Sequence, residues 1–96
     1  EEELIDLNKI AKQFDDVSKK RDLPQSSFDL MKHCAGEVLE AAQAFERLDR
    51  DCDTFEFSLE LCDVIVCCLI IASRYYIDIE TALDQCLEKN KLKIRR

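Results

Sequence analysis

Residues 57–72 read FSLELCDVIVCCLIIA, an almost continuously apolar stretch that decides the fold. Cysteines aside, its only polar residues are Ser58, Glu60 and Asp63. The longest apolar run in it, residues 64–72, is far shorter than the roughly 18 residues that a membrane span needs, so we expect a buried core helix. Charged side chains are rarely buried unless they are paired or bound to a metal. Glu60 and Asp63 therefore need a partner.

A second pair of acids repeats this spacing. Glu37 and Glu40 are three positions apart, as Glu60 and Asp63 are, and 19 residues separate the two pairs. A spacing of three places both acids on one face of a helix. Two helices that meet along these faces would form a four-carboxylate site for a hard divalent cation. The alternative is that these acids, among 21 in the chain, are ordinary solvated residues.

The composition indicates one all-α domain over residues 1–96, with a single Gly, a single Pro and 47% hydrophobic residues. Periodicity and capping signals predict four helices, at about residues 3–20, 26–48, 53–76 and 79–93. Ser26 or Ser27, Asp53 and Asp78 are the expected N-caps of the last three. We expect a protomer resembling a four-helix bundle, with the second and third helices antiparallel.

This arrangement would place the two acidic pairs at nearly the same level along the helix axes. Glu40 lies about 12 Å before the end of the second helix, and Glu60 about 10 Å into the third, at 1.5 Å per residue. Packed helix axes stand roughly 8–10 Å apart, close enough for facing carboxylates to share ions. The pairs can therefore form one site.

Charge and cysteine usage exclude several classes of protein. A net charge of -7 argues against general nucleic-acid binding, although the last eight residues are basic. The six cysteines include no Cys-x-x-Cys pair and fall within helical patterns, so free thiols in a reducing cytoplasm are expected, without zinc. No membrane span or signal peptide is expected, but the chain begins with Glu1, which leaves open whether a natural start precedes it.

The order of these motifs resembles that of the MazG-like nucleoside triphosphate pyrophosphohydrolases. Gly36-Glu37-Val38-Leu39-Glu40 and Glu60-Leu61-Cys62-Asp63 are similar to the family's Glu-x-x-Glu … Glu-x-x-Asp signature. The segment from Lys89 to Lys93 is similar to its Lys-Asn-x-x-Lys/Arg ending. The resemblance covers roughly residues 26–93. It implies an all-α enzyme that uses Mg²⁺, with Mn²⁺ as a substitute, to cleave (deoxy)nucleoside triphosphates into a nucleoside monophosphate and pyrophosphate. Its role would be nucleotide-pool house-cleaning.

Carried over to this chain, the resemblance implies roles for seven residues. The metals would be held by Glu37, Glu40, Glu60 and Asp63. The attacking water would be activated either by one of the acids or by the metal as a bound hydroxide. Among the acids, the candidates for this role are Glu37 and Glu40. The triphosphate or ribose would be contacted by Asn90 and Lys93, with Lys89 as a weaker candidate. His33 is a further candidate from its position alone, one turn before Glu37 on the same helix face. The residues that recognise the base are open, because the chain has no Trp; Gln13 and Phe14 are candidates, with Phe14 more typical of a core residue.

Two other functions remain in view. A phosphoribosyl-ATP pyrophosphohydrolase-like enzyme has a similar acidic signature, but Gly36 precedes Glu37 where a paired Glu would be expected. A non-catalytic nucleotide-binding helical dimer would not need all four acids. In every case the third predicted helix is apolar around nearly its whole circumference, which three other helices of one chain would struggle to cover. We therefore expect a homodimer or a dimer of dimers.

Overall fold

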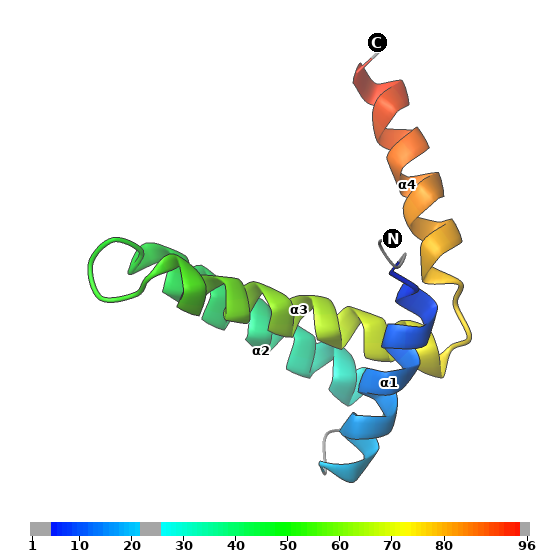
Figure 1. The fold of residues 1–96 in the computed structure, drawn as a ribbon, viewed down its shortest axis with the longest axis horizontal. Helices are drawn as coiled ribbons and strands as arrows, with labels where there is room; N and C mark the ends of the chain where they lie inside the picture. The colour runs from blue at the N-terminus through cyan, green and yellow to red at the C-terminus, as the bar shows by residue number, and fades with distance from the viewer. Residues whose placement is uncertain (1–4, 22–25, 95–96) are drawn as a thin grey trace.

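A computed structural model describes residues 5–21 and 26–94, and this part of the chain is all-α (Figure 1). Four helices follow one another along the chain: α1 (Leu7–Lys20), α2 (Ser27–Glu46), α3 (Thr54–Arg74) and α4 (Ile79–Ile94). No strand occurs in the described ranges, apart from an isolated bridge between Leu48 and Cys52. The all-α prediction and the number of helices are confirmed. The predicted start of the first helix lies partly outside the described residues.

The helices begin at side chains that cap them. The Ser26 hydroxyl accepts a hydrogen bond from the backbone N–H of Asp29 at 3.2 Å, and the Asp53 carboxylate accepts one from Glu56 at 2.8 Å. Asp78 accepts a similar bond from the N–H of Thr81 at 3.2 Å. These bonds satisfy N–H groups that have no partner within the first helical turn. The three predicted N-caps are therefore confirmed, with Ser26 rather than Ser27 at α2.

Helices α2 and α3 form a long antiparallel hairpin, as predicted (Figure 1). The turn between them is closed by hydrogen bonds from the N–H groups of Asp51 and Cys52 to the carbonyl of Arg47, both 3.2 Å long. Asp49 lies in the left-handed region at φ 72°. This short turn fixes the register in which residues of α2 face residues of α3.

Helix α1 crosses α3 near the base of the hairpin, and a partly buried ion pair joins the two. The Arg74 side chain donates to the Asp15 carboxylate at 2.8 Å and to the Ser18 hydroxyl at 2.9 Å. Asp15 and Ser18 are both buried. Burial by itself would raise the pKa of Asp15, but the hydrogen bond and charge of Arg74 and the charge of Lys19 hold it below its usual range.

Helix α4 leaves this body and projects away from the hairpin, with its main contacts on α1 (Figure 1). Its first turn is fixed by hydrogen bonds to the start of α1. The N–H of Leu7 donates to Glu80 at 2.8 Å, and the Asn8 side chain bonds both Asp78 and the N–H of Ile79 at 2.9 Å. The described protomer is therefore more open than a closed four-helix bundle.

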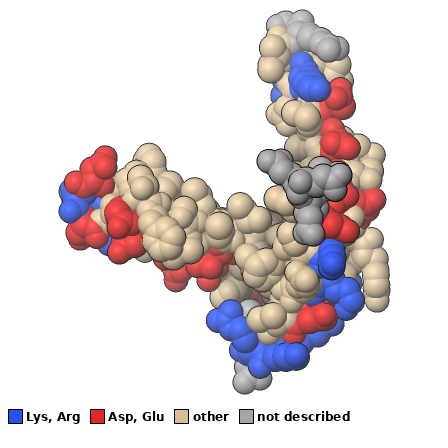
Figure 2. All heavy atoms as spheres, in the orientation of Figure 1, with Lys and Arg blue, Asp and Glu red and all other residues tan. Residues whose placement is uncertain are grey.

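The openness leaves much apolar surface uncovered. The radius of gyration is 15.6 Å, against about 12–13 Å for a compact chain of this length. The buried apolar core consists mainly of small residues, and Leu59, Leu61 and Ile65 of α3 are each about half exposed. Figure 2 shows that the visible face of the hairpin is largely uncharged between its acidic tip and α1. None of the described helices is long and apolar enough to cross a membrane.

Candidate metal centre

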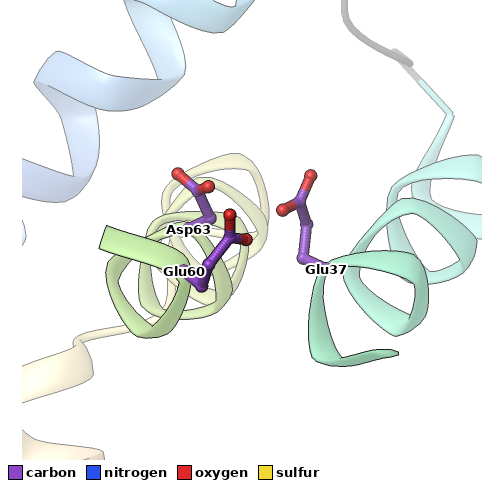
Figure 3. A group of neighbouring side chains, drawn as sticks. All are labelled: Glu37, Glu60 and Asp63. Atoms are coloured by element: carbon purple, nitrogen blue, oxygen red, sulfur yellow. The ribbon is translucent and has the colours of Figure 1, made fainter. Parts of the chain in front are cut away.

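Three acidic side chains meet in the seam between α2 and α3. Glu37 projects from α2 opposite Glu60 and Asp63 of α3, and the three carboxyl groups lie on the same side of the two helices (Figure 3). One oxygen from each residue lies within 4.8 Å of the others. The structure thus brings together three of the four acids that the sequence singled out.

In two of these carboxylates, one buried oxygen has no hydrogen-bond partner among the described residues. The Oε2 atoms of Glu37 and Glu60 are buried and, within the described ranges, have no hydrogen-bond partner. A buried polar atom without a partner is costly, and native structures rarely keep one without a water or an ion beside it. Unsatisfied carboxylate oxygens that face one another are a donor set suited to a hard cation such as Mg²⁺ or Mn²⁺. The residues present therefore fit a divalent metal.

The electrostatics of Glu37 indicate a crowded site. Its side chain is 16% exposed, and burial, followed by the negative charges of Glu40 and Asp63, raises the pKa of Glu37 above its usual range. His33, one turn earlier on α2, has its Nε2 atom 3.4 Å from Oε1 of Glu37 and opposes this shift when protonated. His33 therefore lies beside the first acid of the pair, and its contact with the nucleotide remains a prediction.

Glu40 is not one of the three acids whose oxygens all lie within 4.8 Å of one another. Its side chain is exposed, but it neighbours Glu37, and both its charge and a side-chain hydrogen bond contribute to the raised pKa of Glu37. The role of Glu40 as a metal ligand remains a prediction.

Sulfur atoms near the acids add no charge to the site. Cys67 of α3 is buried, and burial raises the pKa of its thiol to about 11. Burial, followed by the charge of Cys68, likewise raises the pKa of Cys34. These groups are therefore neutral thiols at pH 7, and oxygen is the ligand type that the site offers. All six cysteines are free.

The predicted phosphate-binding residues of α4 do not join the acids within one chain. Lys89, Asn90 and Lys93 are exposed on the part of α4 that projects away from the α2–α3 seam (Figure 1). Asn90 donates to the carbonyl of Cys86 at 2.8 Å, within its own helix. The direction of α4 is set by contacts of its first turn with α1. The sequence pattern did not reveal these contacts.

A small cavity of about 170 Å³ opens beside the acids, and its wall includes Arg21, His33, Glu37 and Asp63. Arg21 was missed by the sequence reasoning, since nothing in its spacing distinguishes it from the other basic residues that end α1. The candidate base-contacting residues Gln13 and Phe14 are exposed on α1 and are not part of this wall. Phe14, at 37% exposed, is also not a buried core residue.

Comparison with known families gives one result that bears on this site. The family model of the MazG nucleotide pyrophosphohydrolase domain matches residues 25–95. This range is well over half of the chain and includes the whole hairpin that carries the acids. Searches of the curated proteins and of the solved structures give no match.

Proposed function

This chain belongs to the MazG nucleotide pyrophosphohydrolase family, and from that premise we propose that it hydrolyses nucleoside triphosphates to a monophosphate and pyrophosphate with Mg²⁺. One observation carries the proposal: Glu37 of α2 faces Glu60 and Asp63 of α3, with buried oxygens that have no partner among the described residues. These three residues would hold the metal. When bound, the cation would offset their charge, bind phosphate oxygens and lower the pKa of a water molecule.

Glu40 is the best candidate for the group that takes the proton. It lies next to Glu37 but outside the three-carboxylate group, so its carboxylate remains available when the others are ligands. Water would attack the α-phosphorus and give its proton to Glu40. The bond from the α-phosphorus to the bridging oxygen would break, and its electron pair would leave with pyrophosphate. His33 would contact the nucleotide from the same face of α2.

Charge balance argues that the basic residues of α4 complete this site from a second copy of the chain. Four carboxylates and a triphosphate carry about eight negative charges at pH 7, more than two divalent ions can offset. Within one chain, α4 carries Lys89, Asn90 and Lys93 away from the acids (Figure 1). The half-exposed apolar residues of α3 and the large radius of gyration favour a homodimer or a dimer of dimers. In such an assembly, a neighbouring α4 would reach the seam.

Mixing two inactive variants tests this arrangement. Glu60→Gln removes a carboxylate from the seam, and Lys93→Ala removes a cation from α4. If each site takes its acids from one protomer and its α4 from another, a mixed dimer contains one intact site, and co-refolded variants regain activity. Sedimentation of the wild-type protein as a monomer at all concentrations, or no recovery in a mixture shown to exchange subunits, would contradict it.

The activity is tested by incubating the protein with Mg²⁺ and a panel of canonical and modified (deoxy)nucleoside triphosphates. We expect release of pyrophosphate rather than orthophosphate. A higher kcat/KM for modified than for canonical nucleotides would support nucleotide-pool house-cleaning. Absence of pyrophosphate with every triphosphate would overturn the enzymatic proposal and leave a nucleotide-binding dimer.

A further inference from the structure

The cavity beside the acids is built by three helices, not only by the hairpin that carries the metal ligands. The α2–α3 hairpin supplies His33, Glu37 and Asp63, and the C-terminal end of α1 supplies Arg21. Leu30, Val66 and Ile70 give the wall an apolar part. The cavity wall therefore combines two of the proposed metal ligands with a residue that carries a guanidinium.

Arg21 is the one lysine or arginine in the cavity wall as far as the structure describes the chain. Its backbone is fixed, because its N–H caps α1 by donating to the carbonyl of Ser18 at 3.2 Å. Its side chain is exposed and has no ion pair with a described residue, whereas the nearby Lys19 lies 3.6 Å from Asp15. Figure 2 shows Lys and Arg gathered around this end of α1. Arg21 thus lines the cavity with its backbone fixed and with no ion pair among the described residues.

We infer that Arg21 binds a phosphate group of the substrate in this cavity, an inference that rests on the proposed function. A guanidinium forms paired, charge-assisted hydrogen bonds to phosphate oxygens and stays charged at all relevant pH values. The cavity places such a group next to Glu37 and Asp63, where any triphosphate bound through the metal has phosphates to neutralise. Arg21 offsets that charge from within the same protomer.

The simpler role for Arg21 is to complement the negative end of the α1 dipole. Lys20 shares that role, because it occupies the last position of α1, but it is not part of the cavity wall. Lys20→Gln is therefore the matched control for Arg21→Gln: both remove one positive charge from the same helix end, and only Arg21→Gln removes one from the cavity. Arg21→Lys keeps the charge and loses the paired geometry.

Binding of inorganic pyrophosphate and of inorganic tripolyphosphate, measured by calorimetry in Mg²⁺, tests the inference without requiring turnover. We expect Arg21→Gln to raise Kd about 10-fold or more, as loss of a charge-assisted hydrogen bond does, Arg21→Lys to raise it less, and Lys20→Gln to leave it within about twofold. In steady-state assays, Arg21→Gln should also raise KM for the nucleotide. Circular dichroism of each variant checks that the fold is retained.

Equal affinity of wild type and Arg21→Gln, or equal losses in Arg21→Gln and Lys20→Gln, would overturn the inference. So would failure of the wild-type protein to bind either polyphosphate. Failure of the proposed function gives a different result: no triphosphate releases pyrophosphate, yet polyphosphate still binds and still depends on Arg21.

Discussion

Replacing Glu37 by Gln should stabilise the metal-free protein while it removes the response to metal. One oxygen of each acid lies within 4.8 Å of the others, and two charges 4.8 Å apart repel by about 3.5 kcal/mol at an effective dielectric constant of about 20. Partial protonation relieves some of this, since burial and the charges of Glu40 and Asp63 raise the pKa of Glu37. We therefore expect a net gain of about 1–2 kcal/mol, and each kcal/mol raises Tm by about 4–8 °C in a domain of this size.

The sign of the pH dependence follows from the same shift. Because the folded protein holds the Glu37 proton to higher pH than the unfolded chain does, this group contributes stability at low pH that is lost as pH rises from about 4.3 through the folded pKa. The advantage of Glu37→Gln over wild type should therefore be larger at pH 7 than at pH 4.

Thermal unfolding in EDTA and in Mg²⁺, at one fixed protein concentration, measures both effects. Wild type should gain about 2.7 kcal/mol at a Mg²⁺ concentration 100 times Kd, and Glu37→Gln much less. Glu46→Gln, an exposed acid on the same helix, is the control and should change neither value. A lower Tm for Glu37→Gln in EDTA, together with an unchanged response to Mg²⁺, would refute the reasoning.

Two further substitutions test the fold around the site. Asp15→Asn removes the buried carboxylate that pairs with the partly buried Arg74 and should cost about 1–3 kcal/mol in urea unfolding at pH 7. Because the pKa of Asp15 is lowered, its contribution is present above about pH 3.9 and is lost below it, so equal stability losses at pH 7 and pH 3 would argue against the pair. Asp49→Gly removes a side chain at φ 72° and should stabilise the hairpin by up to about 1 kcal/mol in urea. Asp51→Gly in the same turn, without a positive φ, should not stabilise, and equal effects of the two would contradict the strain argument.

Local signals in the sequence predicted the hairpin well. Ser26 and Asp53 cap the helices where their side-chain chemistry indicated, and the short turn between Glu46 and Asp53 leaves an antiparallel pair as the simplest arrangement. The similar distances of the two acidic pairs from that turn then place Glu37 opposite the pair on α3. This part of the site depends on capping and helical periodicity, both of which can be predicted from neighbouring residues.

The rest of the site depends on contacts between distant parts of the chain. Hydrogen bonds of Leu7 and Asn8 to Glu80 and Asp78 set the direction of α4, and no periodic pattern reveals them. Arg21 reaches the cavity only because α1 crosses the base of the hairpin. The place of Glu40 outside the three-carboxylate group depends on how α2 is rotated against α3, which the spacing of three leaves undetermined.

The central claim is that the acid group in the α2–α3 seam drives cleavage between the α- and β-phosphates. The most direct measurement is the rate of pyrophosphate release in Mg²⁺ by wild type, by Glu60→Gln, and by Glu56→Gln as an exposed acid one turn earlier on α3. We expect Glu60→Gln to lose at least about 100-fold in kcat/KM, as removal of a metal or charge-stabilising group does, and Glu56→Gln to match wild type. Pyrophosphate release that continues unchanged in Glu60→Gln, or that persists in EDTA, would contradict the account.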